Sequence, residues 1–178
     1  MTLPIVQVGD PVLRARAAAI APADLPGLAE LIAEMRDTMR AAPGVGLAAP
    51  QIGRSLQLAV IEDLATGLTD EQREARERQG VPFHVIVNPS IVPVGDEVVL
   101  AYEGCLSFKG FVMVVPRARR VRVEALDEHG TPIVIEASGW YARILQHEID
   151  HLHGIVCCDR MDPRTLSTVE NRDRPAVP

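Results

Sequence analysis

The most constraining feature of this sequence is the run QHEIDH at residues 146–151. Residues four apart lie on one face of a helix, so His147 and His151 can bind one metal ion together. Glu148, one step around the helix, can then act on a water molecule that the metal activates. This H-E-x-x-H spacing is typical of metal-dependent hydrolases, in which the glutamate is the general base. The alternative interpretation is a pair of surface histidines on an amphipathic helix.

A hydrolytic site of this kind needs a third metal ligand. His153 is two positions from His151 and therefore faces another side of the helix. A better candidate is Cys105, in the run EGCLS at residues 103–107. A thiolate beside two imidazoles makes a three-ligand site with one position open for water. Taken alone, Cys105 would be a small buried apolar residue. The remaining candidates downstream are Asp159, Asp162 and Glu170.

A third segment, GVGLAAPQ at residues 44–51, has the composition of a binding loop. Glycines allow the backbone to approach a ligand closely, because no Cβ intervenes. The amide of Gln51 can donate a hydrogen bond to an oxygen that becomes negative during acyl transfer. By itself this segment could also be an ordinary connection between a helix and a strand.

These three segments, in this order, resemble those of the peptide deformylases. That family carries G-x-G-x-A-A-x-Q, E-G-C-L-S and Q-H-E-x-D-H, and every fixed position is filled here. The similarity runs from Asp10 to about Glu170. Residues 137–140 and 161–165 resemble the branch found in plant and animal mitochondria and in some bacteria.

The resemblance implies hydrolysis of N-formyl-methionyl peptides to formate and a free amino terminus. It implies that Cys105, His147 and His151 bind one divalent metal ion. Fe(II) is the native ion of the family, and Zn(II), Ni(II) or Co(II) suit similar ligands. It also implies that Glu148 transfers the protons. The expected substrates are nascent chains at the ribosome.

The resemblance also assigns the groups that hold the substrate. The side-chain amide of Gln51 and the backbone N–H of Leu106 would hold the oxyanion. The backbone of Gly46 and Gly104 would align the peptide, and Val45 would line the methionine pocket.

Two features depart from the pattern of many bacterial members. They are the sequence FKGFV at residues 108–112 and Arg143, which occupies a usually apolar position of the metal-bearing helix.

The spacing of apolar residues predicts an α+β fold in which antiparallel β-sheets wrap around a central metal-bearing α-helix. Asp150, within the metal motif but pointing away from the metal, is expected to hold a neighbouring basic group. Residues 69–79 are dense in charge and are expected to form a solvated helix or loop with ion pairs. We expect helices at 24–41 and 139–153, the second ended by Gly154, strands at 56–62, 85–88, 98–102 and 112–115, and a hairpin joining 120–126 to 132–136.

Composition favours a single catalytic domain over residues 1–178, with a flexible C-terminal tail from about residue 171. The chain of 178 residues is 47% hydrophobic and 24% charged, enough for one substantial core. Its net charge of −6 argues against direct nucleic-acid binding and against binding to an anionic membrane. We see no apolar run near the ~18 residues of a membrane span and no secretory signal.

The three cysteines include the adjacent pair at 157–158, which is unsuited to a simple bridge, so reduced thiols are expected. The expected location is therefore the cytoplasm, with a mature organellar form that has lost its transit peptide as the alternative. The chain could be a monomer or a homodimer. Two other functions remain open, namely a different metallohydrolase or metallopeptidase on the same ligands and a non-catalytic binding protein that retains the site.

Overall fold

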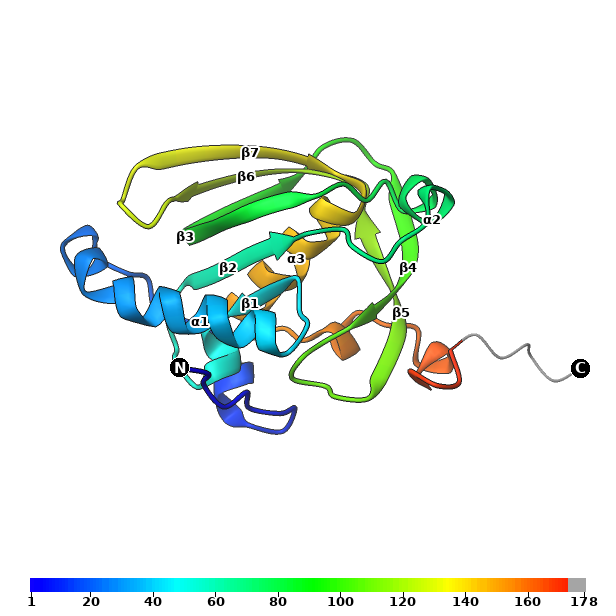
Figure 1. Cartoon of the computed structure of the whole chain (residues 1–178), viewed down its shortest axis with the longest axis horizontal. Coiled ribbons are helices and arrows are strands. Elements are labelled where there is room, and N and C mark those ends of the chain that lie inside the picture. The colour runs from blue at the N-terminus through cyan, green and yellow to red at the C-terminus, as the bar shows by residue number, and fades with distance from the viewer. Residues whose placement is uncertain (173–178) are drawn as a thin grey trace, which may run out of the picture.

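Two antiparallel β-sheets enclose one long helix in the computed structural model, which describes residues 1–172 (Figure 1). Of the expected flexible tail, residues 173–178 lie outside the described part. The larger sheet has the strand order β1-β2-β3-β6-β7 and the smaller one β4-β5-β8. The strands are β1 Gly46–Ala48, β2 Leu58–Asp63, β3 Val81–Pro93, β4 Val98–Gly104, β5 Phe111–Ala118, β6 Arg120–Leu126, β7 Pro132–Ser138 and β8 Ser167–Thr168.

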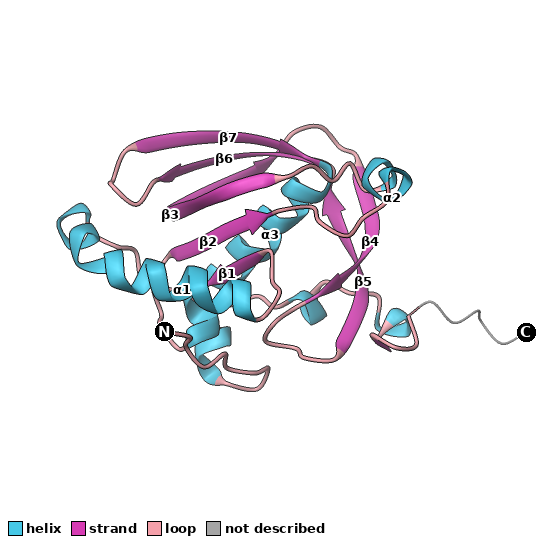
Figure 2. Ribbon diagram, viewed as in Figure 1, coloured by secondary structure: helices cyan, strands magenta, loops and turns pink. Residues whose placement is uncertain are grey.

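The helices α1 (Ala29–Ala41) and α3 (Gly139–Leu152) lie on opposite faces of the larger sheet (Figure 2). Strand β2 shows how the sequence produces this arrangement, because alternate side chains of a strand point to opposite faces. Leu58 and Val60 pack in the cluster that contains Met35 and Met39 of α1. Ala59 and Ile61 pack instead in the cluster that contains Leu145, Ile149 and Leu152 of α3. The predicted α+β fold around a central helix is confirmed.

Helix α3 ends where the sequence predicts. His153 caps it, and Gly154 adopts a left-handed φ of 75°, the conformation that glycine supplies after a helix. Glycine is also required here by space, because a Cβ on Gly154 would lie 2.6 Å from the backbone oxygen of Arg14. The end of the metal-bearing helix is therefore fixed against the N-terminal segment.

Other boundaries differ from the sequence prediction. Helix α1 begins at Ala29 rather than near residue 24, because Pro26 lies in a 3₁₀ segment, Pro22–Leu28, and cannot donate an α-helical hydrogen bond. Residues 46–48 of the expected loop form β1, which pairs with β2. Strand β3 extends well beyond 85–88, and the short β8 was not expected. No helix within residues 1–172 has the length and apolar character of a membrane span.

The charged segment forms the short helix α2, Asp70–Ala75. Thr69 and Gln72 cap its first turn reciprocally, each side chain accepting from the other's backbone N–H. Beyond its end, Arg78 donates two hydrogen bonds to Asp63, at 2.8 and 2.9 Å. The expected solvated helix with ion pairs is confirmed, and the segment that follows it is tied to the larger sheet.

Candidate metal centre

The three candidate ligands converge although Cys105 and His147 are 42 positions apart in the sequence. Cys105 follows the last residue of β4, and His147 and His151 lie on successive turns of α3. Their ligand atoms all lie within 4.8 Å of one another. The Sγ atom of Cys105 is 3.3 Å from Nε2 of His151. Sulfur and imidazole nitrogen in this number suit a divalent transition metal and leave one position open.

Glu103 orients the first of the two histidines. Its carboxylate accepts a hydrogen bond from Nδ1 of His147 at 3.0 Å, which leaves Nε2 of that ring for a metal. Burial alone would lower the pKa of His147, but the hydrogen bond with Glu103 outweighs it and raises that pKa to about 9. A metal that binds here must therefore displace a proton from His147. Burial holds the pKa of His151 well below its usual value, so this second ring is neutral.

Glu103 itself sits in a buried network of opposite charges. Arg117 donates to both of its oxygens, at 2.9 and 3.0 Å, and Arg143 donates to one at 2.7 Å. Burial acts to raise the pKa of Glu103, but the hydrogen bonds from His147 and Arg117 prevail and hold it below its usual range. The carboxylate therefore stays ionised. Sequence reasoning missed this role of Glu103, although its place two residues before Cys105 could have suggested it.

Asp150 holds basic groups, as expected. It accepts a hydrogen bond from Arg117, and Arg160 donates to both of its oxygens at 2.6 and 2.7 Å. Because Arg117 also bonds Glu103, Asp150 on the metal-bearing helix is connected to the carboxylate that orients His147. One network thus joins helix α3 to strand β4, which Cys105 directly follows.

Arg143, the unusual residue on the metal-bearing helix, is not a free charge in the groove. Its side chain is buried, and besides Glu103 it donates to the backbone oxygens of Val115 at 2.8 Å and Val99 at 2.6 Å. It therefore ties α3 to strands β4 and β5. The residue that departs from the family pattern therefore donates to Glu103, the carboxylate that orients His147.

Glu148 is buried beside the ligands, and its Oε2 atom has no hydrogen-bond partner within residues 1–172. Burial raises its pKa to about 7. The nearest wall is Gly46 of β1, where a Cβ would lie only 2.3 Å from Oε1 of Glu148. Gly46 is thus needed to make room for this carboxylate, a reason that sequence reasoning did not supply.

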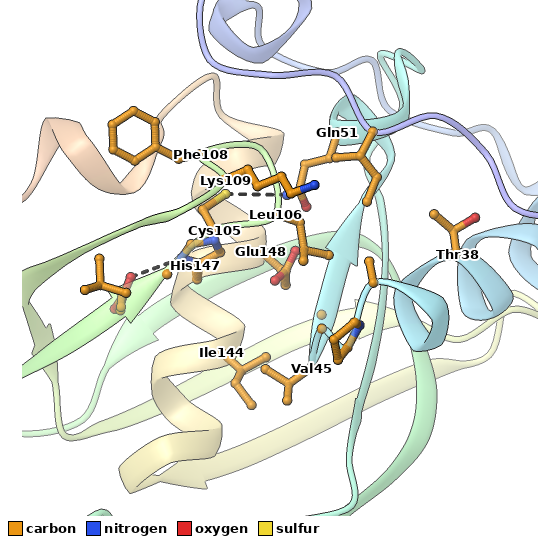
Figure 3. A pocket seen from close by; sticks show the side chains of 18 of the residues that line it. Thr38, Val45, Gln51, Cys105, Leu106, Phe108, Lys109, Ile144, His147 and Glu148 are labelled. Carbon is orange, nitrogen blue, oxygen red and sulfur yellow. Dashed lines mark hydrogen bonds and ion pairs between the residues drawn. The ribbon is translucent and has the colours of Figure 1, made fainter. Parts of the chain in front are cut away.

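The amide of Gln51 is fixed in one orientation. Its oxygen accepts a hydrogen bond from the backbone N–H of Ala48 at 2.9 Å. Its Nε2 atom lies 3.3 Å from the hydroxyl of Ser107 and 3.6 Å from Sγ of Cys105. The donor end of Gln51 therefore points towards the sulfur of Cys105, as Figure 3 shows.

These groups lie at the wall of a groove of about 940 Å³ between the two sheets. Val45, Gly46, Gly104 and Leu106 all line it, together with Cys105, His147 and Glu148, so every candidate site residue except His151 is at the surface of one cavity. In Figure 3, Val45 and Ile144 lie side by side at one end. Phe108 and Lys109, from the divergent run at 108–112, also line the groove. Sequence reasoning missed other walls, which come from Leu3, Trp140 and Ile144 among others.

The fold and the site together define a class, an α+β protein whose groove carries a candidate Cys-His-His metal site. Comparison with known proteins specifies the family. A family model described as polypeptide deformylase matches residues 2–167. The chain belongs to the polypeptide deformylase family, the metal-dependent hydrolases that remove the N-formyl group from nascent peptides.

Individual relatives agree with this placement. The chain is 51% identical to peptide deformylase 3 of Streptomyces avermitilis over 169 residues, which are 94% of this chain and 75% of the relative. It is 42% identical to the human mitochondrial peptide deformylase over 170 residues, 93% of this chain and 70% of the relative. The structure of a peptide deformylase from Synechococcus elongatus in complex with actinonin matches with a TM-score of 0.78 and 37% identity, covering 91% of this chain and 80% of that one.

Proposed function

We propose that Cys105, His147 and His151 bind one divalent cation and that Glu148 moves the protons during hydrolysis of N-formyl-methionyl peptides. The observation that carries this proposal is the convergence of the three ligand atoms within 4.8 Å at the wall of the groove. Glu148 is buried next to His147 in the sequence, and its Oε2 atom has no hydrogen-bond partner among the described residues.

The donor set fits such a cation. Cys105 supplies a thiolate, and the two rings supply neutral nitrogens once His147 has lost its proton. A bound divalent cation would supply Lewis acidity, polarising the formyl carbonyl and lowering the pKa of water. We propose Fe(II) as the native ion, and Zn(II), Ni(II) and Co(II) suit the same donors.

Glu148 has the properties of a group that accepts a proton and later donates it. Its pKa of about 7 lies near neutral pH, where both protonation states are populated. In the proposed reaction it takes a proton from the attacking water and returns it to the departing amine. Gly46 leaves the space in which its carboxylate can do so.

Gln51 and the backbone N–H of Leu106 are the proposed donors to the oxyanion. The hydrogen bond from Ala48 fixes the amide of Gln51 with its Nε2 atom towards the site, so no reorganisation is needed during the reaction. Removing one donor of this kind typically costs about 2.7–4 kcal/mol of transition-state stabilisation.

The two sheets offer edges on which a peptide can be aligned. Strand β1, with Gly46, is an outer strand of the larger sheet, and β4, ending at Gly104, is an outer strand of the smaller one. An extended peptide in the groove could hydrogen-bond to the backbone at both glycines. Val45, with Ile144 beside it, would then form the pocket for the methionine side chain.

The physiological setting belongs to the same proposal. The substrates would be nascent chains at the ribosome, and the enzyme would act in the cytoplasm as a single catalytic domain. An organelle is the alternative location. All the proposed site residues come from one chain, so a monomer or a homodimer can be active.

The test combines metal analysis with an assay of formate release. The chain should be purified without oxygen, its metal content measured, and formyl-methionyl peptides compared with acetyl-methionyl peptides of the same sequence. We expect about one ion per chain and strong preference for the formyl group. Equal rates on both peptides, or full activity of a chain freed of metal, would overturn the proposal.

A further inference from the structure

An N-terminal segment, residues 3–8, lies against the site, although the proposed reaction does not use it. The backbone N–H of Val6 donates to the backbone oxygen of Gln51 at 2.9 Å, and that of Val8 donates to the oxygen of Ser107 at 2.7 Å. Gln51 follows strand β1, whereas Ser107 lies in the loop after strand β4. The segment therefore joins the two parts of the chain that carry the proposed oxyanion donors.

Gln7 lies in the middle of this segment, and its side-chain amide bonds to the loop that follows Cys105. Its Nε2 atom donates to the backbone oxygen of Leu106 at 3.1 Å, and its Oε1 atom accepts from the backbone N–H of Lys109 at 3.3 Å. Nε2 also donates to the backbone oxygen of Ile5 at 3.3 Å, which anchors the amide to its own segment. Both ends of one amide hold the loop, which requires a side chain with a donor and an acceptor.

The loop over residues 105–109 determines where the backbone N–H of Leu106 points. This N–H and the C=O of Cys105 belong to one planar peptide group and point in opposite directions. The oxygen of Cys105 accepts from the N–H of Phe108 at 3.0 Å, so the C=O faces into a turn and the N–H faces away from it. The next peptide group contains the Leu106 oxygen that Gln7 holds. Gln51, Leu106 and Lys109 all line the groove (Figure 3).

We propose that Gln7 is a positioning residue that keeps the backbone N–H of Leu106 directed at the oxyanion. The inference rests on the proposed function of Leu106 as an oxyanion donor. A donor of this kind is effective because it is oriented before the negative charge develops, so that no reorganisation is needed during the reaction. The side chain of Gln7 is exposed and is not part of the core, so its replacement should change the rate more than the folding.

The first experiment uses Gln7→Met, which keeps the length of the side chain and removes both hydrogen bonds to the loop. We expect kcat on a formyl-methionyl peptide to fall about tenfold with KM unchanged. This is less than the loss of about 10²–10³-fold that follows deletion of a donor, because the Leu106 N–H is displaced and not removed. Amide hydrogen exchange at Lys109 should become faster, since its N–H loses its acceptor.

Gln79→Met is the matched control for this variant. Gln79 is also exposed, and its side chain makes no hydrogen bond within residues 1–172. Its replacement should leave kcat, KM and the exchange at Lys109 at the wild-type values. The pair of variants thus separates the two hydrogen bonds of Gln7 from the general effect of placing a methionine on the surface.

A backbone ester at Leu106 separates this inference from the proposed function. Incorporation of the corresponding α-hydroxy acid removes the N–H of Leu106 and keeps its side chain. We expect the ester variant to lose about 10²–10³-fold in kcat at wild-type metal content. Gln7→Met should cause no further loss in that background, because the donor that Gln7 positions is already absent.

The contrary results are distinguishable. An ester variant with wild-type kcat would overturn the role of Leu106 in the proposed function and this inference with it. An impaired ester variant combined with wild-type kcat in Gln7→Met would overturn the inference alone. A tenfold loss from Gln7→Met in the ester background would do the same, because Gln7 would then act by another route. Should Gln7→Met fail to fold, Gln7→Glu, which can accept from Lys109 but cannot donate to Leu106 as a carboxylate, carries the same comparison.

Discussion

The inner wall of the groove and its outer rim are built on different physical principles. At the inner wall, buried charges are paired with one another, since Arg117 and Arg143 surround Glu103 and Asp150 binds Arg117. At the rim, Lys109 on the loop between β4 and β5 and Phe111 at the start of β5 are exposed. The candidate ligand His147 is therefore held by a network of buried, paired charges, whereas the rim presents exposed side chains.

The largest expected effect comes from the inner wall, at Glu148. Glu148→Gln keeps the size of the side chain but removes the group that accepts protons. Because general acid–base catalysis contributes about 10²–10⁴-fold, kcat should fall by that factor while the metal content stays at the wild-type value. Steady-state formate release and metal analysis of the same preparation check this. Undiminished turnover would refute the proton transfer assigned to Glu148.

Next comes the buried arginine that joins both carboxylates. Arg117→Met leaves Glu103 and Asp150 without that partner, and breaking a buried pair costs about 3–5 kcal/mol of unfolding free energy. The pKa of Glu103 is lowered in the folded protein, so its stabilising effect is present above its unfolded pKa of about 4.3 and is lost as the pH falls towards the lowered value.

The gap in stability between Arg117→Met and the wild type should therefore be largest at pH 7 and should narrow in acid. Urea denaturation of the metal-free proteins at pH 7 and at a series of pH values below 4 measures it. Arg119→Met is the matched control, since its carboxylate partners Glu77 and Glu97 are about half exposed and such pairs contribute about 0–1 kcal/mol. Equal losses in the two variants would mean that burial of the network does not matter.

A third prediction concerns space at the inner wall. Gly46→Ala places a methyl group 2.3 Å from Oε1 of Glu148, so the carboxylate or strand β1 must shift. A misplacement of about 1 Å can cost about 10²-fold in rate, and we expect a loss of that order in kcat/KM. Gly27→Ala is the control, because a Cβ there meets nothing within 4 Å among the described residues. Wild-type activity of Gly46→Ala would show that Glu148 or strand β1 can shift to accommodate the methyl group without loss of rate.

The smallest effect is expected at the rim. Lys109→Ala removes an exposed charge from the mouth of the groove, and exposed charges contribute about 0–1 kcal/mol. We expect kcat/KM on a formyl-methionyl tripeptide to change by less than about fivefold, a limit that corresponds to that range. If Lys109→Ala lost as much kcat/KM as Gly46→Ala, the rim would be as sensitive to substitution as the inner wall, contrary to our expectation.

The sequence predicts the residues of the candidate site more accurately than it predicts where helices and strands begin and end. The spacing of His147, Glu148 and His151 requires only a regular helix, and a regular helix is what α3 provides. The apolar periodicity predicts α1 too long, because residues 22–28 around Pro26 form a 3₁₀ segment rather than the first turns of the α-helix. The sequence indicates a loop where β1 forms, since residues 46–48 carry too little pattern to indicate a strand without the partner strand β2.

Within the site, the sequence by itself determined which groups can perform the chemistry. Local spacing fixes which side chains share a helix face, and the family motifs add Cys105 and Gln51 to them. Only the tertiary structure decided how these groups are held. The pairing of Glu103 with His147, the arginines around Glu103 and the contact between Cys105 and His151 join residues distant in the sequence. Such contacts follow from the packing of two sheets around α3, which local spacing does not encode.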